Sequence, residues 1–359
     1  MMKINLKRLF VVFSPLFFIL LSCSSPNPRF ERLLGTICIV NLYEKGTEER
    51  YDEIFARLSQ IHDEFSLGKK GSDLYNINTR AFKEDVVVSD DVFKVLLAAQ
   101  KISSLTDGNF DISVEPLVSL WHINTSSPHV ATQSEIEALL PLVDYKNIVL
   151  NTEKKSVRFL KEGMEIDLGG IAKGFAADEV VKICKKHKIK KAVIDLGGNI
   201  YVYGKKAEKE LWNVGVKNPE FPDEAPLLKL SLPQTSVVTS GVYERFFEEG
   251  EKRYHHILSP KNGFPAENNL YSVTVICENS MIADALSTAF FVLGKEKALK
   301  LLPAIKDELK ASYSELSEIS VIFIENDHKI YLSDNFQYNY SVLSQDWSVG
   351  NQELLQKKQ

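Results

Sequence analysis

The stretch Ile166-Asp167-Leu168-Gly169-Gly170-Ile171-Ala172-Lys173-Gly174 opens with a pentapeptide that occurs a second time at Ile194 to Gly198. The residues after the first copy have the pattern of a helix, which ends in the basic run Lys185-Lys186-His187-Lys188. The second copy joins two apolar runs and is predicted to be a strand, a turn and a strand. Because the spacing does not recur, we interpret the two copies as glycine corners of one strand-helix-strand unit, not as a solenoid.

Apolar periodicity on both sides of this unit predicts alternating strands and helices. We expect strands at 35–42, 147–160, 236–240, 254–258, 271–277 and 321–332, and helices at 47–65, 91–105, 134–140 and 281–293. Asn279 or Ser280 is the expected N-cap of the last helix, and Gly294 is its expected stop. This order predicts an α+β fold with mixed, largely antiparallel sheets flanked by helices, in one domain of two lobes.

The N-terminal segment is typical of a secretory leader. Three basic residues precede an apolar run from Leu9 to Leu21, which is too short to span a bilayer comfortably. Ser22-Cys23 follows and resembles a bacterial lipobox, whose cysteine receives lipid. We therefore expect a signal peptide over 1–22, a lipidated Cys23, a tether over 23–30, a domain over 31–345 and a polar tail over 346–359.

The composition argues against nucleic acid as a partner and against a disulfide or zinc framework. The 359 residues are 44% apolar and 25% charged with a net charge of −5, and cleavage of the leader makes the body more acidic. An acidic body argues against nucleic-acid binding, which needs clustered basic residues. Cys38, Cys184 and Cys277 lie on scattered apolar stretches, so we expect buried free thiols. No zinc motif is present.

Two local patterns could carry chemistry. At the first glycine corner, Gly169 and Gly170 would let a phosphate approach helix N-terminal amides and Lys173, although a plain turn with an exposed lysine fits equally well. Asp284, Ser287 and Thr288 share one face of the last helix and would suit Mg²⁺ or Ca²⁺. The alternative is that Thr288 bonds back to its own helix backbone while Asp284 caps a neighbouring element.

The pair His255-His256 is a third candidate. Neighbouring side chains of a strand point to opposite faces, so only one of the two can face a site and act there as a base. The other reading is a histidine that only makes structural hydrogen bonds.

Six segments in order resemble the ApbE family of FAD:protein FMN transferases, over about residues 35–294. They are Thr106 to Asp111 with Pro116-Leu117 and Leu120-Trp121, Asp167 to Gly174, Asp195 to Asn199, Ser240 to Arg245, His256 to Pro260 with Gly263 and Pro265, and Ala283 to Thr288.

The resemblance implies a site and an ApbE-like, T-fold-like catalytic unit. It implies metal ligation by Gly170, Asp284, Ser287 and Thr288, with Mg²⁺ as the expected ion and Ca²⁺ or Mn²⁺ as alternatives. It implies FAD contacts at Leu34, Asn109, Phe110, Asp111, Asp167, Lys173 and Ile257. His256 is the expected base, and Asp284 is expected to be essential for catalysis.

The implied reaction moves FMN from FAD to a Thr or Ser hydroxyl of an acceptor protein and releases AMP. Expected acceptors carry the pattern Asp-x-x-Ser/Thr-Gly-Ala-Ser/Thr, as in flavin subunits of sodium-pumping or electron-transport redox complexes. The expected location is the bacterial inner membrane, facing the periplasm or the cell exterior. A metal-dependent FAD pyrophosphatase and a surface lipoprotein that only binds FAD are the alternative functions.

Overall fold

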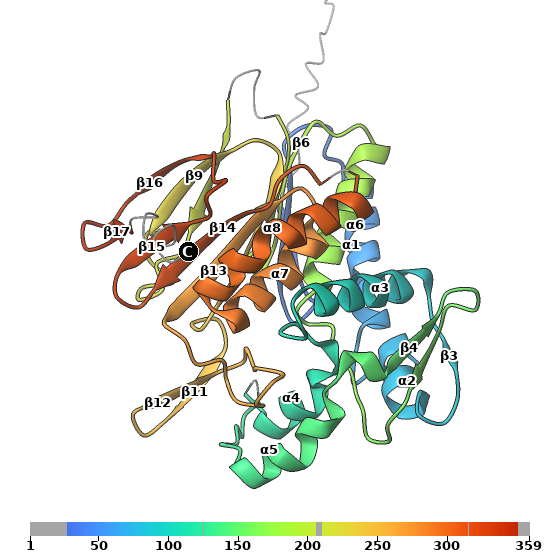
Figure 1. Ribbon diagram of the computed structural model, residues 1–359. Coiled ribbons are helices and arrows are strands. Elements are labelled where there is room, and N and C mark those ends of the chain that lie inside the picture. Colours follow the sequence, from blue (N-terminus) through green and yellow to red (C-terminus); the bar gives the residue numbers. More distant parts are fainter. Residues whose placement is uncertain (1–26, 124, 206–209, 315, 351–359) are drawn as a thin grey trace, which may run out of the picture.

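The computed structural model describes residues 27–350 except 124, 206–209 and 315 (Figure 1). The expected leader, Cys23 and the first part of the tether lie outside the described residues. Within the described range, no helix is both long and apolar enough to cross a bilayer.

A nine-stranded sheet forms the centre of the molecule, in the order β1-β2-β6-β7-β10-β13-β14-β15-β17. Every neighbouring pair is antiparallel except β15 and β17, which are parallel, so the predicted mixed and largely antiparallel sheet is confirmed. The strands are β1 (Arg29–Leu33), β2 (Thr36–Leu42), β6 (Lys191–Leu196), β7 (Asn199–Gly204), β10 (Thr235–Gly241), β13 (Leu270–Cys277), β14 (Ser320–Glu325), β15 (Lys329–Leu332) and β17 (Ser348–Val349).

Helices cover one face of this sheet, and a small sheet covers part of the other (Figure 1). The alternation of side chains serves both layers: Val238 and Val275 pack in the core on the helix side, while Val237 and Ile276 pack against the small sheet. The covering helices are α1 (Glu48–Glu64), α3 (Asp90–Leu105), α6 (Ala172–Lys186), α7 (Ser280–Leu293) and α8 (Lys295–Ser312), and the small sheet contains β8 (Trp212–Val216), β9 (Leu228–Leu232) and β16 (Asn339–Val342).

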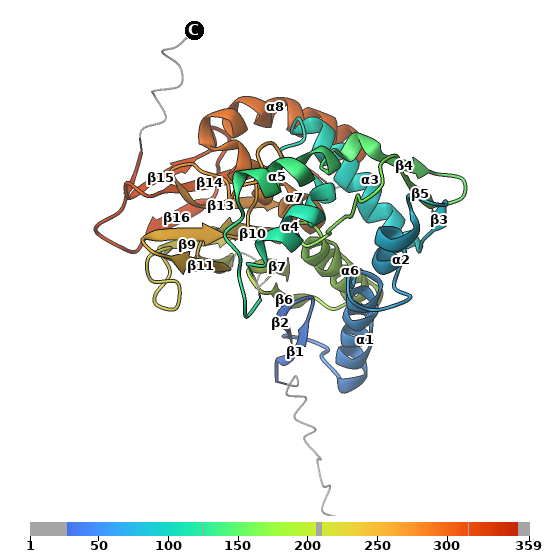
Figure 2. The same cartoon turned by 90° about the horizontal axis from the view of Figure 1, so that it is seen from below.

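The remaining elements lie toward the lower end of the molecule as drawn in Figure 1, and Figure 2 shows them from below. They form a three-stranded sheet, three short helices with 3-10 turns, and a separate hairpin. They are β3 (Val86–Val87), β4 (Ile148–Asn151) and β5 (Ser156–Phe159); α2 (Asp73–Arg80), α4 (Glu115–Trp121) and α5 (Gln133–Leu139); the 3-10 turns η1 (Ile112–Val114), η2 (Leu140–Leu142) and η3 (Tyr145–Asn147); and the hairpin β11 (Phe246–Glu249) with β12 (Lys252–His255).

Helices α6 and α7 pack closely where Gly174 faces the start of α7. A Cβ atom at Gly174 would overlap the backbone carbonyl oxygen of Ser280, so only glycine allows this approach. The N-terminus of α7 is held there by the predicted Asn279 cap, whose side chain accepts from Ile282 N. Asp178 of α6 also accepts from the amides of Ser280 and Met281, both at 2.9 Å. The first turn of α7 is therefore fixed against α6.

Three local predictions were wrong. The chain before the first glycine corner is not a strand, because the side chain of Asn78 takes both backbone groups of Ile166, at 2.9 and 3.0 Å, in place of a ladder. Strand β12 ends at His255, so residues 256–258 form a loop. The packed unit also extends beyond the expected boundary at 345, since Trp347 is buried and β17 pairs with β15.

The three cysteines of the described chain are free and buried, as the sequence predicts. Burial raises the pKa of Cys38 to about 11 and that of Cys184 to about 12, and it also raises the pKa of Cys277. All three side chains are therefore protonated near neutral pH.

We predict that Gly174→Val destabilises the protein, because the new side chain would force α6 away from the Ser280 backbone. Overpacking of this kind costs about 1–3 kcal/mol, measured as a lower midpoint of urea unfolding. Gly68→Ala is the control, since a Cβ at that position meets open space. Equal midpoints for the two variants would contradict the tight contact.

Candidate active site

A cavity of about 710 Å³ opens where the β1–β2 turn, the N-terminus of α6, one face of α7 and the loops after α3 and β12 meet. Segments far apart in the sequence contribute to its wall. It is lined by nearly all of the predicted site residues, namely Leu34, Asn109, Phe110, Asp111, Asp167, Gly170, Lys173, His256, Ile257, Asp284 and Thr288. Residues predicted from separate segments therefore line one cavity.

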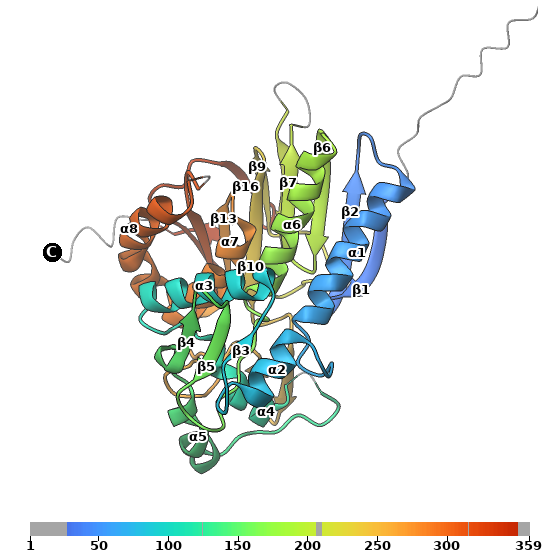
Figure 3. The same cartoon turned by 90° about the vertical axis from the view of Figure 1, so that its right-hand side faces the viewer.

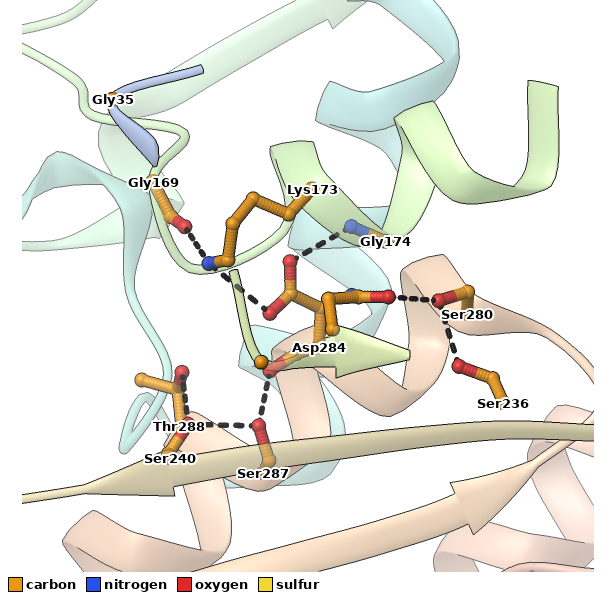
Figure 4. A network of polar contacts seen from close by, with 12 residues as sticks. Gly35, Gly169, Lys173, Gly174, Ser236, Ser240, Ser280, Asp284, Ser287 and Thr288 are labelled. Carbon is orange, nitrogen blue, oxygen red and sulfur yellow. Dashed lines mark hydrogen bonds and ion pairs between the residues drawn. The ribbon is translucent and has the colours of Figure 1, made fainter. Parts of the chain in front are cut away.

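Asp284 lies at the N-terminus of α6, although it belongs to α7. Its Oδ2 accepts from Gly174 N at 2.9 Å, and its Oδ1 lies 3.7 Å from Lys173 Nζ (Figure 4). Ile171, the N-cap residue of α6, makes no capping bond with its side chain. A carboxylate at a helix N-terminus is favoured by the unpaired amides and the helix dipole. Asp284 is only 3% exposed, so a buried negative charge is fixed at the cavity wall.

A chain of hydroxyl groups runs from Asp284 to the end of β10. Ser287 Oγ donates to the backbone oxygen of Asp284 at 2.9 Å and lies 2.8 Å from Ser240 Oγ. Ser240 Oγ in turn lies 3.3 Å from Thr288 Oγ1 (Figure 4). Thr288 lines the cavity, whereas Ser287 is fully buried and does not. Of the two predicted hydroxyl ligands, the structure brings only Thr288 to the cavity and gives Ser287 a supporting position behind Ser240.

The first glycine corner presents backbone to the cavity. At Gly170, a Cβ atom would lie 3.2 Å from the ring of Phe110 and 3.5 Å from Thr288 Oγ1, so this corner sits against α7. Asp167 accepts from Gly169 N and stabilises the bend. Burial raises the pKa of Asp167 above its ordinary value. Lys173 Nζ, in the first turn of α6, donates to the carbonyl oxygen of Gly169 at 3.5 Å and so links the helix to the glycine corner.

Asn109 and Asp111 shape the loop that carries Phe110. Asp111 Oδ1 accepts from the backbone and hydroxyl of Ser113, and its Oδ2 accepts from Tyr145 N at 2.8 Å. Burial raises the pKa of this carboxyl group. The side chain of Asn109 donates to Thr106 O at 2.9 Å. Both predicted contact residues therefore line the cavity while their polar groups hold the loop in place.

The two histidines face different surroundings, although His256 lies beyond the end of β12 and strand alternation does not place it. His255 is buried, and its Nε2 lies 3.2 Å from the backbone oxygen of Ala266. His256 lines the cavity, and its Nδ1 lies 3.1 Å from the backbone oxygen of Arg245. Since a carbonyl oxygen can only accept, Nδ1 carries the proton and Nε2 of the neutral ring is an acceptor. Burial, with Arg245 nearby, lowers the pKa of His256 to about 3.

Sequence reasoning missed Arg245 and Ser240 as site residues, although both lie in a quoted motif. Arg245 lines the cavity, and its Nη2 donates to Gly35 O at 3.3 Å at the turn between β1 and β2. With Lys173, it gives the wall two cations in an acidic protein, an arrangement that suits phosphate oxygens. The available signal was the basic residue that ends the quoted Ser240 to Arg245 segment, but spacing alone did not connect it to the turn at Gly35.

The donor set of the cavity fits a hard cation such as Mg²⁺. Across the described ranges, no group of three or more His, Cys, Asp and Glu side chains could hold a metal. On the α7 side of the cavity, the Asp284 carboxylate and the Thr288 hydroxyl lie next to the Gly170 backbone, and these groups could supply oxygen ligands. Magnesium commonly binds proteins through one or two carboxylates and takes its other ligands from water and substrate phosphates.

Comparison with known proteins agrees with the fold. Two relatives named FAD:protein FMN transferase are similar: that of Klebsiella pneumoniae is 33% identical over 317 residues, which is 88% of this chain and 95% of the relative, and that of Treponema pallidum is 36% identical over 291 residues, covering 76% and 80%.

Solved structures give the same result. The ApbE protein of Thermotoga maritima has a TM-score of 0.75 at 32% identity, covering 86% of this chain and 97% of its own. The flavin transferase ApbE of Vibrio cholerae, at 23% identity, shares the fold with a TM-score of 0.71 and covers 88% and 96%. The family model described as ApbE family matches residues 34–313. The chain belongs to the ApbE family.

Proposed function

We propose that this protein is an FAD:protein FMN transferase that moves FMN from FAD to a Thr or Ser hydroxyl of an acceptor protein and releases AMP. One observation carries the proposal: a buried carboxylate, Asp284, is fixed beside Lys173 and a helix N-terminus in a cavity large enough for a dinucleotide. The names of the relatives support the same activity.

Asp284, Thr288 and the Gly170 carbonyl would hold Mg²⁺, with Ser287 supporting Thr288 through Ser240. Bound there, the ion would neutralise charge on the diphosphate as AMP departs. Ca²⁺ and Mn²⁺ are the other oxygen-seeking ions that this donor set admits.

The protein's own residues divide the remaining work. Lys173 and Arg245 bind diphosphate oxygens, and the first glycine corner positions the diphosphate. These roles matter because phosphoryl transfer depends mostly on positioning and electrostatics. The acceptor oxygen forms a bond to the FMN phosphorus while the bond from that phosphorus to the AMP oxygen breaks. His256 takes the hydroxyl proton at Nε2, and the negative charge of bound FAD raises its proton affinity.

We propose the acceptors from the family resemblance and the location from the N-terminal sequence. The acceptors would carry Asp-x-x-Ser/Thr-Gly-Ala-Ser/Thr, as expected of flavin subunits of sodium-pumping or electron-transport complexes. The basic, apolar, small and Cys order of residues 1–23 supports lipidation at Cys23 and a place on the outer side of the bacterial inner membrane.

Asp284→Asn is expected to lower kcat for Mg²⁺-dependent AMP release from FAD by about two to three orders of magnitude, because the fixed charge at the reacting phosphates is lost. Release is followed by chromatography of the nucleotides, and folding is checked by thermal unfolding. Asp307→Asn, at an exposed position of α8, is the matched control. A folded Asp284→Asn protein with unchanged release would exclude Asp284 from the mechanism.

His256 gives a pH prediction. A histidine of ordinary pKa would become protonated as the pH falls through about 6.5 and would then fail as a base. With its pKa lowered to about 3, His256 stays neutral, so kcat/KM, which reports the free enzyme, should show no loss centred near pH 6.5.

His256→Gln should slow transfer to an acceptor peptide, while His122→Asn, at an exposed position, should not. The pH profile and the two variants are measured with the same peptide. A wild-type loss near pH 6.5 that disappears in His256→Gln would show that the ring titrates normally.

An incubation of FAD and Mg²⁺ with and without the acceptor peptide separates the three functions. A flavin-labelled peptide together with AMP is the expected result. AMP and free FMN in equal amounts with no labelled peptide would identify a pyrophosphatase, and intact bound FAD would identify a protein that only captures flavin.

A further inference from the structure

Large apolar side chains are exposed on the outer face of β1 and β2. Phe30 is 71% exposed, Ile37 57%, Ile39 39% and Tyr43, just after β2, 47%. Phe30 pairs across the strands with Ile39, and Ile37, Ile39 and Tyr43 alternate along the chain, so the side chains share one face of the sheet. We call these four residues the apolar strip.

The small sheet reaches Tyr43 but does not extend over Phe30, Ile37 and Ile39. On this face, the side chains of β7, β10 and β13 pack against β8 and β9, as Val202, Val237 and Ile276 illustrate. The contact between the rings of Tyr43 and Trp212, with centroids 5.7 Å apart, marks the border of that layer. Figure 3 shows β1 and β2 at the edge of the large sheet, away from the small sheet.

Charged residues surround the strip without covering it. Arg32 is exposed and pairs across the strands with Ile37. On the neighbouring strand, Asp195 accepts from Gly198 N at 3.1 Å, and Lys191 forms an ion pair with Glu44 at 3.0 Å. Apolar side chains beside an exposed arginine suit the interfacial region of a bilayer that contains anionic lipids.

The length of chain before β1 indicates which surface the strip meets. Cys23, the proposed lipid attachment site, precedes Phe30 by seven residues, which span at most about 25 Å when fully extended. An anchor this short would keep the start of β1 close to the bilayer surface. The strip, which begins at Phe30, would then lie close to the lipid.

We propose that the apolar strip lies on the membrane surface and, together with the lipid anchor, holds the β1–β2 hairpin flat on the bilayer. This inference rests on the lipidation proposed above. The turn of the hairpin, Leu34-Gly35, lines the cavity, and β1 is only about 17 Å long at strand spacing. The cavity is therefore held at the membrane surface, and the acceptor class is a protein whose target hydroxyl lies close to the bilayer.

The test uses the full lipidated protein in vesicles of phosphatidylethanolamine and phosphatidylglycerol. An environment-sensitive fluorophore is attached at Ile39→Cys or, as a matched control, at Val149→Cys, an exposed strand position on the separate three-stranded sheet. The native cysteines are buried and do not compete for the label. We expect a blue shift and several-fold stronger quenching by brominated lipid at position 39 than at 149.

Solvent-like emission at both positions would overturn the proposal. A blue shift at position 39 that persists in delipidated protein without vesicles would also overturn it, because a second copy or the tether would then cover the strip. The sedimentation coefficient of that sample would distinguish a dimer, in which a second copy covers the strip, from a monomer covered by its own tether.

The double variant Phe30→Gln, Ile37→Gln links orientation to activity, with Val87→Gln, Val149→Gln as its control. We expect the strip variant to transfer FMN normally to a soluble peptide but several-fold more slowly to an acceptor reconstituted in the same vesicles. Equal loss with both acceptors would contradict the membrane role. If the wild-type protein did not transfer FMN to the soluble peptide, the proposed transferase function would be contradicted. The fluorescence measurement does not depend on transfer, so it would still test the membrane contact.

Discussion

The contact between Asp284 and the first turn of α6 is the constraint on which the site depends. A carboxylate from one helix completes the N-terminus of another, so two elements about 110 residues apart in the chain are joined at the cavity wall. Burial makes the contact costly to break, since an uncompensated charge would remain. Lys173, one residue before the amide that Asp284 accepts from, brings the compensating charge.

This contact requires close helix packing, and the sequence around it provides that. Gly174 allows the backbones to approach, and Asp178, one turn further along α6, binds the first amides of α7. Behind α7, Ser236 Oγ donates to Ser280 Oγ at 2.8 Å and ties the same turn to β10. The large sheet thus acts as the rigid support that sets the distance between the carboxylate and the glycine corner.

Much of this arrangement could be predicted from the sequence, because its local signals are strong. The Asn279 cap and the Gly294 stop depend on neighbouring residues only, and Gly197 and Gly198 have the positive φ angles that favour glycine in a tight corner. The absent strand before Asp167 could not be predicted, because a distant side chain, Asn78, replaces the ladder there. Nor could spacing reveal that Ser287 turns away from the cavity or that Arg245 reaches it, since both depend on how β10 and the β1–β2 turn meet.

The sequestered thiols have a consequence for how the chain matures. Only the thiolate form of a cysteine reacts to give a mixed disulfide. Because burial raises the pKa of Cys38, Cys184 and Cys277, very little thiolate is present at these positions near neutral pH. In the part of the chain that the structure describes, the cysteines are free, so the fold there does not rely on a disulfide. Under the export proposed above, these three thiols would stay reduced on either side of a redox boundary.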